Sequence, residues 1–214
     1  MKKPNPVWLF RITHIDNLDH VLKHGLVTES SPNANPNFKK IGDSTLIDFR
    51  KDLSAPDPPG GCFRDYIPFY FGPRSPMLYQ IATGWEDIEK ISQAEIIYLI
   101  TTVEAIVDHG LDFFFSDGHA RIETSLKFTD LAHLNAIDWD AVYSTVWKSD
   151  RNNLQRKEKK QAEFLVKNHL PLSCIEKIGV YNQAINKKIC RILAETSCNI
   201  QVITSPKKLY YDHL

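Results

Sequence analysis

The segment PPGGCFRDYIPFYFGPRSPMLY, residues 58–79, says the most about the fold. Its DYIPFYF portion has the aromatic and β-branched content of a strand, and Pro68 requires a sheet edge or a bulge because proline lacks a backbone N–H. Ser75 is a good N-cap, Pro76 takes the favoured first helical position, and Gly84 is a natural terminator. The segment therefore predicts a strand, a short loop and a helix in direct succession.

The same segment gathers groups that suit a nucleotide. Two glycines permit close backbone approach, and aromatic residues follow them. Arg74 and Ser75 stand at a helix start, where free N–H groups and the helix dipole favour a phosphate. These groups fit a nucleotide with a diphosphate. The alternative is a proline-bracketed strand and helix whose aromatics fill the core, and the pattern alone leaves both open.

Strand and helix patterns are mixed along the rest of the chain. Strands are expected at VWLFRIT (7–13), IIYLITT (96–102), DFFFSDGH (112–119), AEFLVK (162–167), IEKIGVY (175–181) and NIQVIT (199–204). Helices are expected after residue 14, at VEAIVDHG (103–110), at FTDLAHLNAI (128–137) and at NQAINKKICRILAET (182–196), whereas 30–44 and 55–61 have the composition of loops. Because strict βαβ alternation is absent, we predict the α+β class.

Composition predicts an ordinary globular protein. The 214 residues are 43% hydrophobic, which fits a single domain over 1–214, and no apolar run approaches the ~18 residues that span a bilayer. The N-terminus lacks a signal-peptide pattern, and the four scattered cysteines predict free thiols. We therefore expect a cytoplasmic monomer that has no contact with a membrane.

The charges exclude some classes of function and leave others open. The 26 acidic and 26 basic residues cancel, which argues against a protein coated in positive charge but leaves room for a local patch. QRKEKKQ (155–161) is the candidate, although a charge run is more often a solvated face. No P-loop or dinucleotide fingerprint is present. Asp117 and His119 lie two residues apart without further ligand spacing, so we expect no metal site.

The stretch QAEFLVK, residues 161–167, places an acid among apolar residues directly after four cations. Strand alternation puts Glu163 on the same face as Leu165 and Lys167, opposite Phe164. By pattern alone, a solvent-facing carboxylate is the favoured interpretation, and a residue that performs chemistry is the alternative.

Two further groups of polar residues have ordinary explanations as well. Arg11, Thr13, His14 and Asn17 lie where the first strand meets a helix, a position that suits a ligand but also ordinary capping, which the pattern favours. Arg50, taken alone, is an arginine of the surface.

Several motifs together resemble the DarT family, whose members are toxins of toxin–antitoxin pairs that ADP-ribosylate DNA bases using NAD. They are RITHIDNLDHVLKHGL (11–26), the 58–79 segment, FSDGHA (115–120), KKQAEFLV (159–166) and IGVYNQ (178–183). They occur in the family's order and cover nearly the whole chain. The resemblance implies the ADP-ribosyltransferase fold, a split mixed β-sheet with an NAD cleft between its halves. It also implies NAD as co-substrate, a DarG-type macrodomain antitoxin as partner, and no metal.

The resemblance assigns roles to individual residues. Glu163 matches the catalytic glutamate, Arg50 the arginine that acts with it, and Tyr70 the tyrosine near the nicotinamide ribose. The first NAD-binding block corresponds to Thr13, His14 and Asn17, with Arg11 departing from relatives that carry histidine, and Ser75 also falls beside the cofactor. Arg74 and His119 match residues on the DNA-facing side, and the basic stretch before Glu163 matches a loop that faces the substrate. We therefore expect Arg74, Lys157, Lys159 and Lys160 to contact phosphates, with Tyr143 and Trp147 as stacking platforms.

The implied chemistry explains the carboxylate. Breaking the bond between ribose and nicotinamide develops positive charge on the sugar, which a nearby carboxylate stabilises. A carboxylate can also accept the proton that thymine N3 must lose, and neighbouring cations would keep Glu163 ionised. Single-stranded DNA exposes the base without unstacking a duplex.

Thymine is the expected target of this chemistry. Guanine in DNA, or RNA or protein as acceptor, is the alternative for the same fold. A non-catalytic nucleic-acid-binding module is a third possibility.

Overall fold

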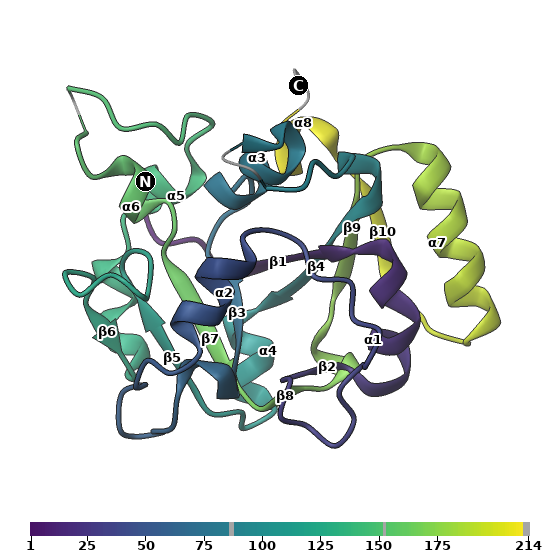
Figure 1. Ribbon diagram of the computed structural model, residues 1–214, viewed down its shortest axis with the longest axis horizontal. Coiled ribbons are helices and arrows are strands. Elements are labelled where there is room, and N and C mark those ends of the chain that lie inside the picture. The colour runs from purple at the N-terminus through teal and green to yellow at the C-terminus, as the bar shows by residue number, and fades with distance from the viewer. Residues whose placement is uncertain (86–87, 152, 212–214) are drawn as a thin grey trace.

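The computed structural model describes residues 1–85, 88–151 and 153–211, and its centre is a mixed β-sheet (Figure 1). The eight strands lie in the order β10–β9–β4–β1–β3–β7–β5–β6, and only the β9–β10 pair is parallel. They are β1 (Trp8–His14), β3 (Tyr66–Tyr70), β4 (Ile96–Thr102), β5 (Phe113–Ser116), β6 (Lys127–Phe128), β7 (Glu163–Lys167), β9 (Lys177–Val180) and β10 (Gln201–Thr204). A separate two-stranded sheet pairs β2 (Leu26–Val27) with β8 (His169–Leu170).

The sheet divides between β1 and β3. Strand β1 pairs with β4 along its whole length, from Trp8 to His14, but meets β3 at the single pair Phe10↔Tyr70. Strand β3 in turn pairs with β7 over all five of its residues. The expected α+β class and split mixed sheet are confirmed, and the two halves diverge from one shared point.

Pro68 explains the divergence in part. It lies in the middle of β3 opposite Leu165 of β7, and its carbonyl oxygen accepts a hydrogen bond from the Arg11 guanidinium at 2.9 Å. Its carbonyl therefore faces β1, along an internal edge where a missing N–H interrupts no ladder. The prediction that Pro68 needs an edge is confirmed, with the edge inside the sheet rather than at its rim.

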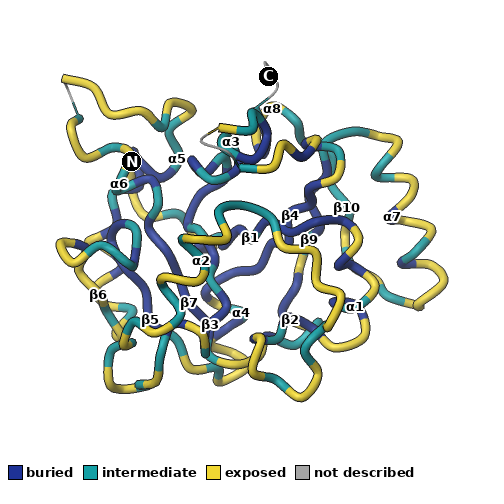
Figure 2. Tube along the Cα trace, viewed as in Figure 1, coloured by how far each residue is buried: buried dark blue, intermediate teal, exposed yellow. Residues whose placement is uncertain are grey.

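Helices cover both faces of the sheet, and the central strands β1, β3, β4 and β7 are mostly buried (Figure 2). On one face, α1 (Leu18–His24), α4 (Val103–Asp108) and α7 (Gln183–Glu195) pack on the largest apolar cluster. On the other face, α3 (Pro76–Thr83) and α8 (Pro206–Leu209) pack on β1 and β4. The described residues contain no helix that is both long and apolar enough to cross a membrane.

Helix α3 forms as its sequence predicts. The Ser75 hydroxyl accepts the backbone N–H of Leu78 at 3.2 Å, Pro76 opens the helix, and Gly84 ends it in the left-handed region at φ 71°. This helix fixes the Arg74–Ser75 corner beside the end of β3.

Other elements differ from expectation. Helix α2 (Ser44–Arg50) was not predicted, because its seven residues are too few to show a helical period and follow a segment with the composition of a loop. The expected helix at 128–137 is instead the end of β6 followed by a 3₁₀ helix, η5 (Leu131–Ala136). Helices α5 (Trp139–Tyr143) and α6 (Arg156–Lys159) are single short turns that precede β7.

Candidate active site

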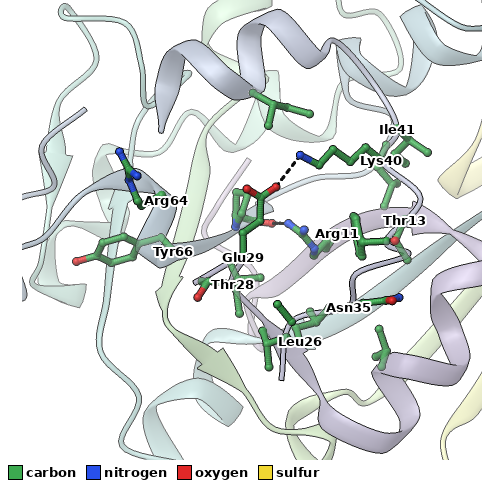
Figure 3. Close-up of a pocket in the computed structure, with 18 of the residues that line it drawn as sticks. Arg11, Thr13, Leu26, Thr28, Glu29, Asn35, Lys40, Ile41, Arg64 and Tyr66 are labelled. Atoms are coloured by element: carbon green, nitrogen blue, oxygen red, sulfur yellow. Dashed lines mark hydrogen bonds and ion pairs between the residues drawn. The ribbon is translucent and has the colours of Figure 1, made fainter. Parts of the chain in front are cut away.

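A cavity of about 590 Å³ opens at the split of the sheet. Its volume lies within the ~300–1,000 Å³ typical of small-molecule sites. Five residues expected at the active site line it, namely Arg11, Thr13, Arg50, Tyr70 and Glu163. Figure 3 shows Arg11 and Thr13 of β1 close to Glu29 of the loop that follows β2, and all three line this space.

Glu163 is buried in this cavity wall and fully engaged. Its side chain is 1% exposed, and Oε2 accepts a hydrogen bond from Arg50 Nη2 at 2.7 Å. Oε1 accepts the backbone N–H of Ala120 at 3.1 Å and lies 2.7 Å from His119 Nδ1. An ionised carboxylate only accepts, so Nδ1 carries the proton. The solvent-facing carboxylate favoured by strand alternation is therefore wrong.

These contacts keep Glu163 charged. Burial alone would raise the pKa of Glu163, but the charge of Arg50 and the hydrogen bonds from His119 and Arg50 outweigh it and lower the pKa to about 2. Burial alone would lower the pKa of Arg50. The charge and the hydrogen bond of Glu163 outweigh burial, so the pKa of Arg50 is raised. The site thus holds a carboxylate that stays ionised throughout the neutral range.

Tyr70 lies directly across the ladder from Glu163, because β3 and β7 pair these two residues. Directly opposite residues share a face, with Cβ atoms about 5 Å apart. Burial, and then the nearby charge of Glu163, raises the pKa of the Tyr70 hydroxyl. Tyr70 therefore keeps its proton and can donate it in a hydrogen bond beside the carboxylate.

Arg50 reaches Glu163 from the last turn of α2. Its side chain is 19% exposed, and its guanidinium lies 5.5 Å from the ring centre of Phe63. The cation–π contact and the ion pair together fix the guanidinium at the cavity wall. The role of Phe63 was not predicted, although the residue falls within the informative 58–79 segment.

Arg11 spans the split and has an unused donor. One of its terminal nitrogens bonds the carbonyl of Pro68, while its buried Nε has no hydrogen-bond partner among the described residues. Burial, and then the charge of Arg50, lowers the pKa of Arg11 to about 10, so it remains a cation. A buried unpaired N–H is costly, and a ligand acceptor in the cavity would satisfy it. The Arg11 side chain thus suits an anionic ligand, such as a diphosphate.

The other expected cofactor residues act mainly on the local backbone. Asn17 bonds the Thr13 hydroxyl at 2.9 Å and both backbone groups of Lys39, so it ties the 30–43 loop to the end of β1. His14 Nδ1 accepts the N–H of Asp16, and Ser75 caps α3. None of His14, Asn17 and Ser75 is among the described residues that line the cavity.

The cavity rim carries an ion-pair network that no sequence motif predicted. Glu29 pairs with Lys40 at 2.8 Å, as Figure 3 shows, and with Lys51 at 3.3 Å. The Lys40 contact lowers the pKa of Glu29. The network connects the loop after β2 to the end of α2, so both sides of the rim are held together.

Several of the expected DNA contacts lie around α3, since Arg74 directly precedes this helix and Trp147 packs on its Tyr79. Arg74 donates to the Lys207 carbonyl at 3.1 Å. The Trp147 ring lies 5.2 Å from that of Tyr79 in α3, and the exposed Lys157 lies 5.8 Å from the Trp147 ring. Tyr143 is partly buried and packs on the core, and burial raises its pKa to about 12.

Three of the expected DNA contacts are engaged with the protein itself. Lys160 is 1% exposed and bonds backbone carbonyls, so its ammonium group does not reach a phosphate. Lys159 pairs with Asp117 at 2.7 Å. His119 contacts Glu163 directly. The expectation of a surface phosphate contact at Lys160 is therefore corrected, because position in a basic run says nothing about burial.

The site and fold define a class of protein. A carboxylate held ionised by an arginine, beside a ligand-sized cavity at the split of a mixed sheet, matches the ADP-ribosyltransferase arrangement that the sequence motifs led us to expect. No group of three His, Cys, Asp or Glu side chains in the described parts of the chain is placed to hold a metal ion.

Comparison with known proteins identifies the family. Residues 10–211 match the family described as "DarT: ssDNA thymidine ADP-ribosyltransferase, DarT". The chain belongs to this family, as the sequence motifs led us to expect, and the class is that of NAD-dependent DNA ADP-ribosyltransferases.

Named relatives and solved structures agree with the family match. A DNA ADP-ribosyl transferase of Thermus sp. (strain 2.9) is 38% identical over 194 residues, covering 90% of each chain. One from Escherichia coli O127:H6 is 31% identical over 201 residues, covering 94% of this chain and 92% of the relative. Thermus sp. 2.9 DarT in complex with ADP-ribosylated ssDNA superposes with a TM-score of 0.90 at 34% identity, over 99% of each chain. The same protein in complex with NAD+ gives 0.83 at 34% identity, over 98% of this chain and all of that one.

Proposed function

We propose that this chain is the toxin of a toxin–antitoxin pair and transfers ADP-ribose from NAD to thymine in single-stranded DNA, with Glu163 as catalytic carboxylate and Arg50 as its partner. One observation carries the proposal: Glu163 is 1% exposed, yet bonded to Arg50, His119 and the backbone of Ala120 at the cavity wall. Burying a carboxylate costs desolvation free energy, which charged and hydrogen-bonding partners offset. A buried, ionised carboxylate at the wall of a cavity is therefore a candidate functional group.

The cavity residues fit NAD. The unpaired Arg11 Nε suits a diphosphate oxygen, and Tyr70 offers a hydroxyl beside Glu163. Asn17, Thr13 and His14 shape the wall of the site through the backbone and the 30–43 loop, and Ser75 does so by starting α3. NAD, when bound, supplies the ribosyl carbon that accepts the base and the nicotinamide that leaves. Support comes from a relative, the Thermus sp. 2.9 DarT, which was solved in complex with NAD+.

Glu163 has two tasks in this proposal. Its negative charge stabilises positive charge that develops on the ribose, and the donors from His119 and the Ala120 backbone hold its Oε1 atom in place. It also accepts the proton that leaves thymine N3. A carboxyl with a pKa of about 2 is a weak base, so part of the Arg50 contact must loosen as the base arrives. Arg50 then has a free donor edge for the diphosphate or the base.

The DNA strand reaches this carboxylate along α3. Arg74 and the exposed Lys157 provide cations for phosphates, and Trp147 with Tyr143 offers aromatic faces for bases. Lys159 can contact a phosphate only by exchanging its ion pair with Asp117. His119 fixes one oxygen of Glu163 on the DNA side. Thermus sp. 2.9 DarT in complex with ADP-ribosylated ssDNA supports this acceptor.

We propose a DarG-type macrodomain antitoxin as the partner. An enzyme that modifies the DNA of its own cell requires a protein that reverses or blocks it. A relative from Thermosipho africanus is named a DNA ADP-ribosyl transferase–DNA ADP-ribosyl glycohydrolase fusion protein. By this reasoning the activity belongs in the cytoplasm, where the DNA is.

The test compares Glu163→Gln with Glu195→Gln, which removes the same charge from an exposed position on α7. Each protein is incubated with labelled NAD and, in separate reactions, with single-stranded oligonucleotides containing thymine or guanine as the acceptor, with RNA, and with protein. We expect the wild type and Glu195→Gln to label thymine DNA and Glu163→Gln to lose at least a hundredfold in rate. Labelling of RNA or protein in preference to DNA, or full activity of Glu163→Gln, would contradict the proposal.

A further inference from the structure

Lys160 is a buried cation that the proposed chemistry does not use. Its side chain is 1% exposed, although lysine is rarely buried without partners. The ammonium donates to the backbone oxygens of Ser144 at 2.7 Å, Val142 at 2.8 Å and Pro73 at 3.3 Å. Burial, and then the charge of Arg74, lowers the pKa of Lys160 to about 7. Three carbonyl acceptors match the three protons of an ammonium group, which favours the charged form.

The three carbonyls belong to two segments far apart in sequence. Pro73 lies in the turn between β3 and α3, whereas Val142 and Ser144 lie at the end of α5. The same segments also touch directly, because a Cβ built on Gly72 would lie 2.3 Å from the Val142 oxygen. Only glycine permits this approach. The buried ammonium of Lys160 and the close approach at Gly72 are therefore two separate contacts between the same two segments, 72–73 and 142–144.

Each segment continues into a group proposed for the DNA strand. Arg74 follows Pro73 and has φ 54°, a left-handed conformation that is costly for a residue with a side chain. The hydroxyl of Tyr98 accepts its N–H at 3.1 Å, and the hydroxyl of Tyr211 donates to its carbonyl at 2.6 Å. The α5 segment continues to Trp147, which packs on Tyr79.

We propose that Lys160 is a positioning residue: it joins the Pro73 turn to the end of α5, holds Arg74 and Trp147 at a fixed separation along the DNA path, and does not itself contact phosphate. The inference rests on the proposed function, since it concerns how that function's DNA strand is held. Lys160 is absent from the cavity wall among the described residues and bonds none of the residues that line it, so we expect its replacement to affect the oligonucleotide more than NAD.

Amine footprinting of the wild-type protein tests the first half of this proposal. A limiting amount of acetic anhydride modifies accessible lysines, and mass spectrometry locates them with and without a thymine oligonucleotide and without NAD. We expect Lys157 to react and to be protected by the oligonucleotide, and Lys160 to stay unmodified in both conditions. Reaction of Lys160 that the oligonucleotide suppresses would identify a direct phosphate contact and overturn the proposal.

Binding measurements on Lys160→Met test the second half, with Lys188→Met on the exposed face of α7 as the matched control. Oligonucleotide affinity is measured by fluorescence anisotropy and NAD affinity by calorimetry. We expect Lys160→Met to bind the oligonucleotide at least tenfold more weakly while NAD affinity stays within twofold of wild type. Unchanged oligonucleotide affinity, or an equal loss for both ligands, would overturn the proposal.

A second variant covers a failure of Lys160→Met to fold. Gly72→Ala forces the same two segments apart without changing a charge. We expect it also to weaken oligonucleotide binding while NAD affinity stays near that of the wild type. Wild-type transfer of label from NAD to the oligonucleotide is measured alongside. Failure of that reaction concerns the proposed function, whereas the footprint and the affinities concern Lys160.

Discussion

The ion pair of Glu163 makes the stability of the protein depend on acid in a defined way. The pKa of Glu163 falls from its ordinary 4.5 to about 2 in the folded protein. Because the folded value is the lower one, the stabilisation is fully present above about pH 4.5 and is lost as the pH falls towards 2. At about 1.4 kcal/mol per pH unit, the whole effect is about 3 kcal/mol, of which about 2 kcal/mol is lost by pH 3.

Glu163→Gln isolates this effect, because the amide does not titrate. At pH 7 the variant should be less stable than wild type, since Arg50 loses its charged partner. Urea unfolding at pH 6, 5, 4 and 3 measures both proteins, and the difference in the free energy of unfolding should shrink by roughly 2 kcal/mol between pH 6 and pH 3. Other carboxylates titrate equally in both proteins and cancel.

The exposed Glu195 provides the control. In Glu195→Gln the same charge is removed without breaking a buried pair, so its difference from wild type should stay nearly constant over the same range. A constant difference for Glu163→Gln as well would refute the claim that the fold holds Glu163 ionised, and with it the electrostatic basis of the site.

Three further predictions concern the frame around the site. Arg50→Lys keeps a positive charge but loses the planar guanidinium beside Phe63, and should lower the rate of ADP-ribosyl transfer at least tenfold in a single-turnover assay while the circular dichroism spectrum is unchanged. Asn17→Ala removes one buried hydrogen bond to Thr13 and two partly buried ones to Lys39 of the 30–43 loop, and should cost about 1–3 kcal/mol in urea unfolding and weaken NAD binding in calorimetry; wild-type values of both would contradict the role given to Asn17. Ser75→Ala removes the cap of α3 and should cost about 1 kcal/mol, seen as a lower midpoint of thermal unfolding than that of Ser197→Ala, which changes a serine outside the helices.

Local rules were sufficient where neighbouring residues determine the structure. Helix α3 begins and ends where Ser75, Pro76 and Gly84 predict, since caps act over a few residues. Pro68 correctly indicated a strand edge, because its missing N–H is a property of the residue itself. Alternation also assigned the faces of β7, with Phe164 in the main core and Leu165 in the smaller cluster around Phe63.

Burial of charged side chains could not be predicted in the same way. Glu163 and Arg50 are 113 residues apart, and nothing local to either indicates that they meet. Lys160 belongs to the same basic run as Lys157, yet its acceptors lie as far as 87 residues away and remove it from the surface. The resemblance to a family singled out Glu163 as the catalytic residue, which stays a prediction. It also suggested a surface role for Lys160 that the burial of this side chain contradicts, because a motif carries no information about burial.

The single ladder pair between β1 and β3 bears on how mutation can inactivate such a protein. Where two strands diverge, peptide groups along the facing edges are available to a ligand, and a substitution changes a side chain without removing them. Backbone groups would then make part of the hydrogen bonds to a bound dinucleotide. These bonds would survive most single substitutions of the residues that line the cavity. When cells are selected for survival of expression of this protein, loss-of-function substitutions should accordingly occur mainly at Glu163 and Arg50. They should be rare among the residues that only line the cavity.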